Sequence, residues 1–462
     1  MEILKKSQYV QFIEDGEMAV VWHSLFGYPQ IVNRNGLELI DAFSNPIGVD
    51  EIKKAEKFDE IDENVAILKN SFMLVPPDFN ERSFLEKKTL SYNEAISDGK
   101  NIEYLSIIPS EKCNFCCTYC ISNSMIDVSY RKGNKKRIMS WETAKKAIDV
   151  FLSILRSHNK KQAYINFGGG EPLLNWKLVD RTLSYCQNVY EKDFEFIFRI
   201  NTNASLINRN VAETLKAHGV KIALSMDGLS GANDKVRISK SGVNSFVQII
   251  KAMDILSDIN FGLTGFSTTI TEENFDLIDE NLILFAQKRG FIDLRVDLDV
   301  IHMLSVPVDV AAQKLLYLKS FAESKGIQVT GFWERPIENA NHSVLERNIA
   351  FCGGIAGKSM CVNPSEDVFI CGYSAKKFAS LSRAAIISSD IYKNIVSARM
   401  VGNIDRCKNC IIEGQCVGGC HITEEFGEVG NNLALQYNCE LYRTMTLELF
   451  KDSLRKAIME ST

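Results

Sequence analysis

The chain lacks any apolar run near the ~20 residues needed to span a bilayer. Its first residues, MEILKKSQYVQFIEDGE, contain no apolar segment typical of a signal peptide, so we expect a cytoplasmic protein with no membrane partner. Fixed-period repeats and low-complexity segments are absent, which excludes solenoid and fibrous architectures. Excess charge is absent too: 53 Lys and Arg against 58 Asp and Glu give −5, so we expect no nucleic-acid partner.

The 462 residues are enough for two to four domains at ~100–200 residues each. The cysteine content is unusual, because the chain contains 13 cysteines. An odd number of cysteines without a secretion signal disfavours a disulfide framework. Twelve fall within Cys113–Cys120 and Cys352–Cys439, and only Cys186 stands apart. Two dense groups of thiols indicate metal binding.

Residues 1–80 alternate short strand and helix patterns, which predicts a small α+β module of winged-helix type. We expect strands at Tyr9–Glu14, Met18–His23, Pro29–Asn33 and Ser71–Val75, and helices at Leu37–Phe43, Val49–Lys57 and Glu60–Lys69. The polar and charged residues 81–100 are expected to form a linker.

Residues 101–310 alternate longer strand and helix patterns, which predicts βαβ units and a parallel sheet. We expect six strands, at Tyr104–Pro109, Ala163–Phe167, Phe194–Ile200, Val220–Met226, Phe261–Ile270 and Ile292–Val300. Six units are too few for an eight-stranded barrel, so an open, partial barrel is expected, with its chemistry at the C-terminal ends of the strands.

Three further regions complete the predicted domain organisation. Residues 311–350 are expected to bridge to a domain at 351–445, and residues 446–462 to form a C-terminal helix. The region 351–445 is rich in cysteine, glycine and short segments. We therefore expect it to lack a conventional apolar core and to be organised by metal.

The first cysteine group follows directly on the first predicted barrel strand, as Cys113-Asn-Phe-Cys-Cys-Thr-Tyr-Cys120. Cys113, Cys117 and Cys120 have the spacing C-x₃-C-x₂-C. Three thiolates on one loop can hold three irons of a [4Fe–4S] cluster and leave the fourth iron open. Zinc is the alternative, but a structural zinc site needs four ligands, and the nearby Cys116 is adjacent to Cys117.

This loop, with Tyr119 before its last cysteine, resembles that of the radical S-adenosylmethionine (SAM) enzymes. The second strand ends in Phe167-Gly-Gly-Gly-Glu-Pro172, which matches the family's Gly-Gly-Glu motif. The resemblance implies that Gly169, Gly170 and Glu171 bind the amino group of SAM. A tight strand-to-helix turn is the alternative.

Polar residues at the following strand ends match family positions that contact SAM. The resemblance implies that the cofactor-binding set also includes Tyr119, Asn201, Asn203, Ser225 and Arg237. A guanidinium such as that of Arg237 could pair bidentately with the SAM carboxylate. Taken singly, strand-end Asn and Ser are often only turn formers. In such enzymes a 5′-deoxyadenosyl radical derived from SAM removes a hydrogen atom from substrate.

The second cysteine group has eight members and contains the run C-x₂-C-x₅-C-x₃-C. It resembles the SPASM domain of peptide-modifying radical SAM enzymes, which implies two auxiliary [4Fe–4S] clusters and so three in all. By analogy, one is held by Cys352, Cys361, Cys371 and Cys420, and the other by Cys407, Cys410, Cys416 and Cys439. Two zinc sites are the alternative. An electron donor such as flavodoxin or ferredoxin is also implied.

Two departures from the SPASM pattern are visible. Glu366 stands where a glycine is usual, and a turn over Asn363–Asp367 can substitute for it. Gly372 follows Cys371 where anaerobic sulfatase-maturating enzymes carry a catalytic Asp, which disfavours sulfatase maturation. The catalytic base is therefore unassigned. The candidates are Tyr373, Asp297 and Asp299, with structural hydrogen bonds as the alternative role for each.

The N-terminal module carries 7 basic and 14 acidic side chains, a charge that opposes phosphate binding. Its segment Val21–Asn33, followed by Gly36–Ile40, resembles the recognition element of ribosomal-peptide modifying enzymes. That element binds a leader peptide by adding a strand to its sheet edge. A structural cap on the barrel is the alternative, and His23 is expected to be a packed histidine.

The combined resemblance implies an α/β fold: a partial (β/α)₆ radical SAM barrel with an N-terminal winged-helix-like module and a C-terminal iron–sulfur SPASM domain. The implied function is a radical SAM peptide maturase that acts on a ribosomally synthesised precursor peptide. We expect it to install a Cys thioether cross-link of the sactipeptide or ranthipeptide kind. Carbon–carbon cross-linking, sulfatase maturation and a non-catalytic iron–sulfur protein are the alternatives. Cys116 and Cys186 have no assigned role and are expected to be buried thiols.

Overall fold

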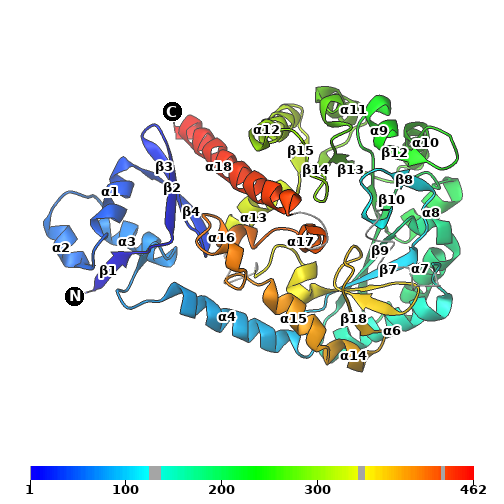
Figure 1. The fold of residues 1–462 in the computed structure, drawn as a ribbon, viewed down its shortest axis with the longest axis horizontal. Helices are drawn as coiled ribbons and strands as arrows, with labels where there is room; N and C mark the ends of the chain where they lie inside the picture. Colours follow the sequence, from blue (N-terminus) through cyan, green and yellow to red (C-terminus); the bar gives the residue numbers. More distant parts are fainter. Residues whose placement is uncertain (1, 124–136, 342–348, 428–431, 462) are drawn as a thin grey trace.

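The computed structural model describes residues 2–123, 137–341, 349–427 and 432–461. Its largest part is an open barrel of parallel strands with helices on the outside, at the right of Figure 1. Its elements are β7 (Tyr104–Ser110), α6 (Trp141–Ser157), β9 (Gln162–Gly169), α7 (Trp176–Tyr190), β10 (Glu195–Thr202), α8 (Arg209–Ala217), β11 (Lys221–Leu224), α9 (Ser230–Val236), α10 (Ser245–Asp258), β13 (Gly265–Ile270), α11 (Glu280–Lys288), β14 (Asp293–Leu298), α12 (Val308–Ser324) and β15 (Gln328–Thr330). All six predicted strands are present.

The barrel extends beyond the predicted strands at both edges. One sheet has the order β11-β10-β9-β7-β16-β17-β18 and another the order β13-β14-β15. A parallel bridge between Ser225 and Ser267 joins them. Strand β16 (Ser359–Val362) comes from the C-terminal region and runs parallel to β7. The C-terminal region therefore supplies one wall of the barrel.

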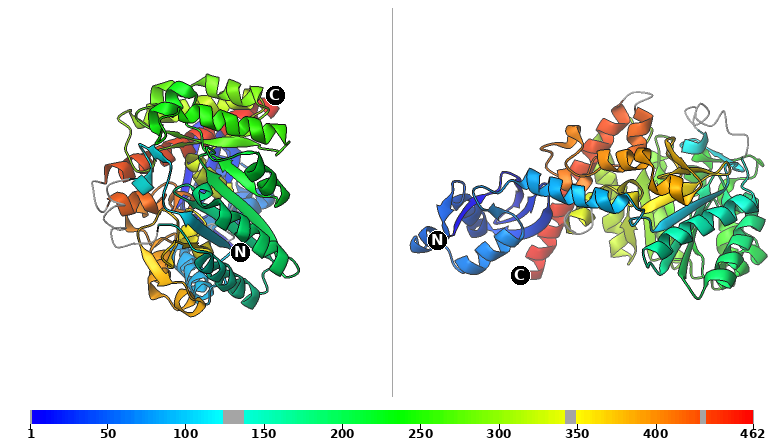
Figure 2. Two further views of the ribbon diagram at one scale, coloured as in Figure 1. Left: turned by 90° about the vertical axis from the view of Figure 1, so that its right-hand side faces the viewer. Right: turned by 90° about the horizontal axis from the view of Figure 1, so that it is seen from below.

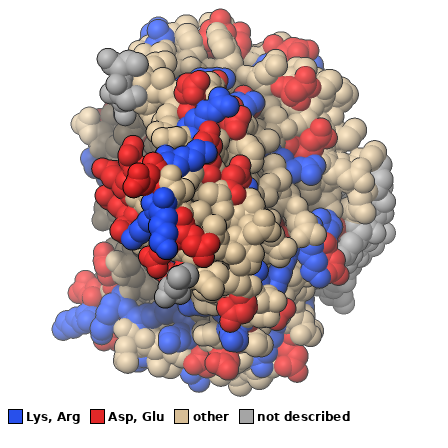
Figure 3. Space-filling model, turned by 90° about the vertical axis from the view of Figure 1, so that its left-hand side faces the viewer, with Lys and Arg blue, Asp and Glu red and all other residues tan. Residues whose placement is uncertain are grey.

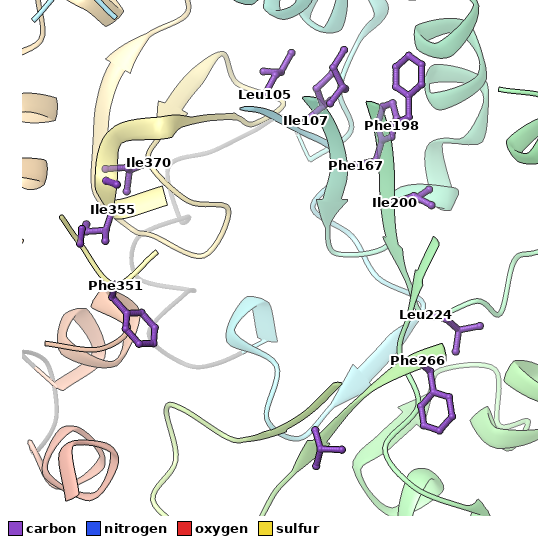
Figure 4. Packing of buried hydrophobic residues seen from close by; sticks show 14 of the residues in the cluster. Leu105, Ile107, Phe167, Phe198, Ile200, Leu224, Phe266, Phe351, Ile355 and Ile370 are labelled. Atoms are coloured by element: carbon purple, nitrogen blue, oxygen red, sulfur yellow. The ribbon is translucent and has the colours of Figure 1, made fainter. Parts of the chain in front are cut away.

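Strand alternation gives the barrel an apolar outer face and a polar inner face. Leu105, Ile107, Phe167, Phe198 and Ile200 are buried in the main hydrophobic core, and Figure 4 shows them along neighbouring strands. On the opposite face, Ser106 of β7 and Arg199 of β10 both lie in register with Asn166 of β9. The inner face is thus free to receive a polar ligand.

The C-terminal region shares this core, which corrects the expectation that it would lack one. Phe351, Ile355 and Ile370 are buried in the same cluster as the barrel residues (Figure 4), and Tyr392 belongs to it as well. Its elements are β16, β17 (Asp367–Phe369), β18 (Lys377–Ser380), α14 (Arg383–Ile387), α15 (Asp390–Ala398), α16 (Glu413–Cys416), α17 (His421–Gly427) and α18 (Leu433–Ser461), preceded by α13 (Arg335–Asn341). The last helix starts well before the predicted residue 446, so Cys439 lies on it. No described helix combines the length and apolarity needed to cross a membrane.

A turn between β16 and β17 accommodates Glu366 at the usual glycine position. Glu366 adopts φ +65°, a left-handed conformation that favours glycine. The side-chain oxygen of Asn363 accepts hydrogen bonds from the N–H groups of Ser365 and Asp367, at 3.0 and 2.9 Å, and thereby closes the turn. The Glu366 carboxylate also lies 2.6 Å from the ammonium of Lys146 on α6. The substitution is therefore compensated locally.

The N-terminal module lies at the far end of an elongated molecule (Figures 1 and 2). It contains two three-stranded antiparallel sheets, β5-β1-β6 and β2-β3-β4. Its elements are β1 (Ile3–Lys6), β2 (Val10–Asp15), β3 (Met18–His23), β4 (Gly27–Asn33), α1 (Arg34–Ala42), β5 (Ile47–Gly48), α2 (Val49–Lys54), α3 (Ile61–Asn70) and β6 (Leu74–Val75). Leu4, Val21, Leu39, Ile40 and Phe43 belong to a separate core of its own. Acidic side chains interrupt the basic ones on the side of the molecule where this module lies (Figure 3).

The predicted linker is mostly helix α4 (Glu81–Ile96), which runs from the module toward the barrel (Figure 1). Asn80 caps it, because its side-chain oxygen accepts a hydrogen bond from Ser83 N at 2.9 Å. Residues 81–96 contain neither Gly nor Pro, so their polar composition suits a helix as well as a linker.

His23 at the end of β3 is fully buried and neutral. Its Nδ1 accepts hydrogen bonds from the N–H groups of Leu25 and Phe26, at 3.2 and 3.1 Å, so the ring proton lies on Nε2, 3.1 Å from Ser7 Oγ. Burial lowers its pKa from 6.5 to about 3. The ring packs on Phe26 with centroids 4.4 Å apart.

This histidine makes the fold sensitive to acid. Between pH 6.5 and about 3, the unfolded chain binds a proton at His23 that the folded chain does not, so stability falls as pH falls. The slope is about 1.4 kcal/mol per pH unit. Urea unfolding at pH 7 and pH 5.5 should show this loss, and His23→Asn, which keeps an acceptor, should reduce it. An equal loss in His23→Asn would contradict the assignment.

Candidate functional site

The first cysteine loop is held at the C-terminal end of β7 by a short two-stranded sheet. Strand β8 (Phe115–Cys117) pairs antiparallel with β12 (Arg237–Ser239), which sets Cys117 opposite Arg237. Burial raises the pKa of Cys117 to about 12; the Arg237 charge lowers it, and Asp227 and the Cys120 and Cys113 thiolates raise it further. The three predicted ligands thus lie near one another. Cys116 is exposed, which corrects the expectation of a buried thiol, whereas Cys186 is buried as expected.

The Gly-Gly-Glu motif packs against the backbone of this loop. Gly169 has φ +106°, and a Cβ on Gly170 would lie 2.4 Å from the carbonyl oxygen of Lys112. The N–H of Gly170 donates to Ser110 O at 2.9 Å, and that of Glu171 donates to Lys112 O at 3.0 Å. The glycines are therefore required for a close approach of two backbones.

Gly170→Ala should destabilise the protein, because its methyl group has no room between two backbones. We expect the free energy of unfolding to fall by about 1–3 kcal/mol and the affinity for SAM to fall with it. Gly168→Ala is the matched control, because a Cβ there meets no atom within 4 Å. Denaturant unfolding and calorimetric titration with SAM measure both effects, and equal stability of the two variants would contradict the prediction.

Glu171 is buried and joins three strand ends. Its Oε1 accepts hydrogen bonds from Leu173 N at 3.0 Å and Thr202 Oγ1 at 2.8 Å, and its Oε2 accepts one from Asn203 N at 2.9 Å. Burial raises its pKa, and these hydrogen bonds oppose the rise. The side-chain amide of Asn203 in turn lies 3.7 Å from Cys113 Sγ. Asn201, two residues earlier on β10, lines a cavity on the inner face.

A buried triad lies beside the cysteine loop. Arg237 Nη1 donates to the Tyr119 hydroxyl at 2.6 Å and to Asp227 Oδ2 at 3.1 Å, and the Tyr119 hydroxyl donates to the same carboxylate oxygen at 2.5 Å. Arg237 Nε is buried without a hydrogen-bond partner in the described part of the chain. Asp227 is thus a site residue that the sequence prediction missed, although it lies two residues after the predicted Ser225. Ser225 is half-buried at the end of β11.

Two groups of C-terminal thiols lie close enough to affect the pKa values within each group. Burial raises the pKa of Cys371, and the thiolates that raise it further are those of Cys352, Cys420 and Cys361. Burial likewise raises the pKa of Cys416, followed by the thiolates of Cys439, Cys407 and Cys410. Within the described residues, no three His, Cys, Asp or Glu side chains are arranged to hold a single metal ion.

A cavity of about 660 Å³ separates the inner face of the barrel from the C-terminal region. Gly168 and Gly169 line it on the barrel side, and Cys352, Cys361 and Cys371 line it on the other. Its described lining also contains three cations and no carboxylate; the cations are Arg199, Arg335 and Lys358. A ligand in this cavity would contact both the barrel strands and three of the C-terminal cysteines.

The three candidate bases differ in their surroundings. Tyr373 lines the cavity and is 46% exposed. Asp297 accepts hydrogen bonds from Phe332 N at 2.5 Å and from Arg295 Nε at 2.6 Å. Asp299 accepts from Ile301 N at 2.8 Å and pairs with the His302 ring at 2.7 Å. Of the three, Tyr373 alone is among the cavity's lining residues.

A three-cysteine loop and a Gly-Gly-Glu turn at adjacent strand ends of an open barrel define a radical SAM protein. Residues 107–284 match the model of the Radical SAM superfamily. The chain is 27% identical over 421 residues to the radical SAM cyclopropyl synthase TigE of Paramaledivibacter caminithermalis, covering 87% of each chain. It is 30% identical over 273 residues to an uncharacterized Methanocaldococcus jannaschii protein, covering 58% of this chain and 85% of that one. The chain belongs to the radical SAM superfamily.

Two solved structures show the same fold. One, anSMEcpe with bound AdoMet, has a TM-score of 0.61 and 17% identity and covers 77% of this chain and 99% of its own. The other, Streptococcus suis SuiB bound to precursor peptide SuiA, has a TM-score of 0.51 and 15% identity and covers 91% of this chain and 96% of its own. At these identities the likeness concerns the fold alone: an α/β radical SAM fold with an additional C-terminal region.

Proposed function

We propose that the protein is a peptide maturase that removes a hydrogen atom from a ribosomally made precursor peptide and installs a Cys thioether cross-link. The observation that carries this proposal is the cavity of about 660 Å³, because the Gly-Gly-Glu strand end and three C-terminal cysteines line the same space. A peptide bound there would face both the SAM site and the C-terminal thiols. The name of the SuiB structure, which includes a bound precursor peptide, supports a peptide substrate.

The described residues fit SAM and its cluster. Cys113, Cys117 and Cys120 would hold three irons of a [4Fe–4S] cluster. Glu171 has about four lone-pair positions, of which the protein uses three, so one remains for the SAM ammonium. Arg237 Nε is a buried donor that lacks a partner among the described residues and suits an anionic group of SAM. When bound, SAM and the cluster supply the 5′-deoxyadenosyl radical.

The rest of the chemistry is assigned to the chain's own groups. A cross-link removes two hydrogens from the peptide, so an electron and a proton must leave after the first hydrogen atom. The two C-terminal thiol sets would hold auxiliary [4Fe–4S] clusters that accept the electron. A flavodoxin or ferredoxin would be the external electron donor. Tyr373 is our candidate for the group that handles the proton, because it lines the cavity.

The N-terminal module is proposed to bind the leader part of the peptide. In the described structure β4 pairs with β3 on one side only, so its other edge can accept a strand. A groove of about 440 Å³ runs beside this edge, between Ile31–Asn33 of β4 and Phe58–Asn64 at the start of α3. The exposed Ile31 offers an apolar contact within it.

The test uses the reconstituted, reduced protein with SAM and a short Cys-containing peptide encoded beside its gene. We expect 5′-deoxyadenosine and a peptide that has lost two hydrogens per cross-link. Iodoacetamide separates the bond types, because a thioether sulfur no longer reacts whereas a carbon–carbon cross-link leaves the thiol free. Formylglycine in the product would instead support sulfatase maturation, the function that Gly372 disfavours. Absence of 5′-deoxyadenosine with and without peptide would refute the enzyme proposal.

A further inference from the structure

A five-residue segment, Cys416–Cys420, connects the two C-terminal thiol sets. Cys416 belongs to one set and Cys420 to the other, so this is a direct covalent path between the two proposed clusters. Its three inner residues, Val417, Gly418 and Gly419, have φ values of +46°, +73° and +69°. For the β-branched Val417 this conformation is strained, so the surroundings must hold the segment in place.

Two arginines hold the segment through its carbonyl groups. Arg399 Nη2 donates to Gly419 O at 3.1 Å and to Gly418 O at 3.3 Å, and Arg406 Nη2 donates to Gly418 O at 3.0 Å. Both guanidiniums also pair with one oxygen of Glu424, that of Arg406 at 2.8 Å. Two positive charges thus share one carboxylate, and the group retains a net positive charge.

Arg399 lies between the thiol sets and has one donor to spare. Its charge lowers the pKa of Cys407 in one set and of Cys420 in the other. The residue is 8% exposed, and its Nε has no hydrogen-bond partner in the described part of the chain. A buried cation with an unused N–H is costly unless further negative charge lies nearby. Two anionic iron–sulfur clusters would supply that charge.

We propose that Arg399 is a positioning residue that lies between the two auxiliary clusters, fixes the segment that joins them and raises the reduction potential of both. A nearby cation favours the state that carries one more negative charge, which is the reduced cluster. Net charge and hydrogen bonds to sulfur are established determinants of iron–sulfur potentials. This inference rests on the proposed auxiliary clusters and is independent of the peptide's identity.

The test is a redox titration followed by electron paramagnetic resonance, on a full-length background with Cys113, Cys117 and Cys120 changed to Ala. Only the C-terminal clusters then contribute to the spectra. Arg399→Gln should make the reduction potential of an auxiliary cluster more negative by about 59 mV for one electron. This corresponds to a change of about tenfold in the reduction equilibrium. Glu424→Gln removes the shared negative charge and should shift it in the opposite direction. Arg383→Gln, an exposed arginine of α14, should cause no shift.

Opposite shifts with unchanged iron content support the proposal. Unchanged potentials in both variants, with iron content equal to that of the parent, overturn it. Where Arg399→Gln loses iron, Arg399→Lys decides: retained iron and a parent-like potential support a charge role, and equal loss of iron shows a purely structural role. A parent protein without C-terminal iron would instead refute the auxiliary clusters themselves.

Discussion

Cys120→Ala should reduce the formation of 5′-deoxyadenosine from SAM to the level of a protein-free control. Cys120 is one of three thiols that gather on the loop after β7, beside the carboxylate of Glu171 and the triad of Arg237. Removing one of three cluster ligands removes the iron–sulfur site to which SAM must bind, so the whole reaction is lost. The measurement is chromatographic quantification of 5′-deoxyadenosine after reduction with dithionite.

Cys116→Ala is the matched control for this experiment. Cys116 lies in the same loop and is exposed. It pairs through its backbone with Ile238 of β12, so its thiol is not needed for the pairing of β8 with β12. We expect its variant to keep the parent's iron content and activity within twofold. A loss in Cys116→Ala equal to that in Cys120→Ala would show that the ligand set is wrong.

Arg82→Met should lower the free energy of unfolding by about 3 kcal/mol. Arg82 at the start of α4 donates from Nη1 and Nη2 to the two carboxylate oxygens of Glu413, at 2.5 and 2.8 Å. Glu413 is 2% exposed, so removing the guanidinium leaves a buried carboxylate without its partner. Because Glu413 lies between the proposed ligands Cys410 and Cys416, we also expect loss of iron from that set.

A double-mutant cycle isolates the ion pair from the rest of the side chain. Glu413→Gln and the double variant Arg82→Met/Glu413→Gln complete it, and the double variant should be more stable than Arg82→Met alone. Chemical unfolding followed by circular dichroism gives all four values. Additive losses would mean that the two side chains do not interact.

The contacts around Glu413 show that the N-terminal module is fixed to the second thiol set. Trp22 Nε1 donates to Ile411 O at 2.8 Å, and the N–H of Gly414 donates to Ser24 O at 2.8 Å. A Cβ on Gly414 would lie 1.8 Å from Leu25 O, so the two backbones are in direct contact. Residues 411–414, which lie between Cys410 and Cys416, therefore face the module that we propose to bind the leader.

The barrel was predictable because strand patterns and helix patterns alternate along residues 101–310. Each strand also carries enough apolar residues to be recognised in the sequence. Strand β16 was not predicted, because its four residues, Cys361 among them, are too few to show an alternation of apolar and polar side chains. Its partner β7 is also remote in sequence. Helix α4 was predicted as a linker because its residues are mostly polar and charged. The capping residue Asn80 does not by itself identify the start of a helix. The shared core of the C-terminal region depends on contacts with the barrel, which no local pattern contains.

The site was predictable where chemistry requires fixed spacing, as in the cysteine loop and the Gly-Gly-Glu turn. Asp227 was missed because a strand-end aspartate resembles any turn former until Arg237 and Tyr119 are placed beside it. The same holds for Thr202, whose hydroxyl donates to Glu171. Both roles arise when separate strand ends meet, and that meeting is a property of the fold.

The parallel pairing of β16 with β7 has a consequence for synthesis on the ribosome. Tyr104 and Leu105 emerge long before Ser359 and Met360, their partners on the adjacent strand. Until then one edge of β7 remains open, and pairing over such a separation is slow. The wall that completes the cavity can close only after most of the chain has left the exit tunnel. The C-terminal thiols also emerge late, so we expect the proposed auxiliary clusters to be assembled only near the end of synthesis.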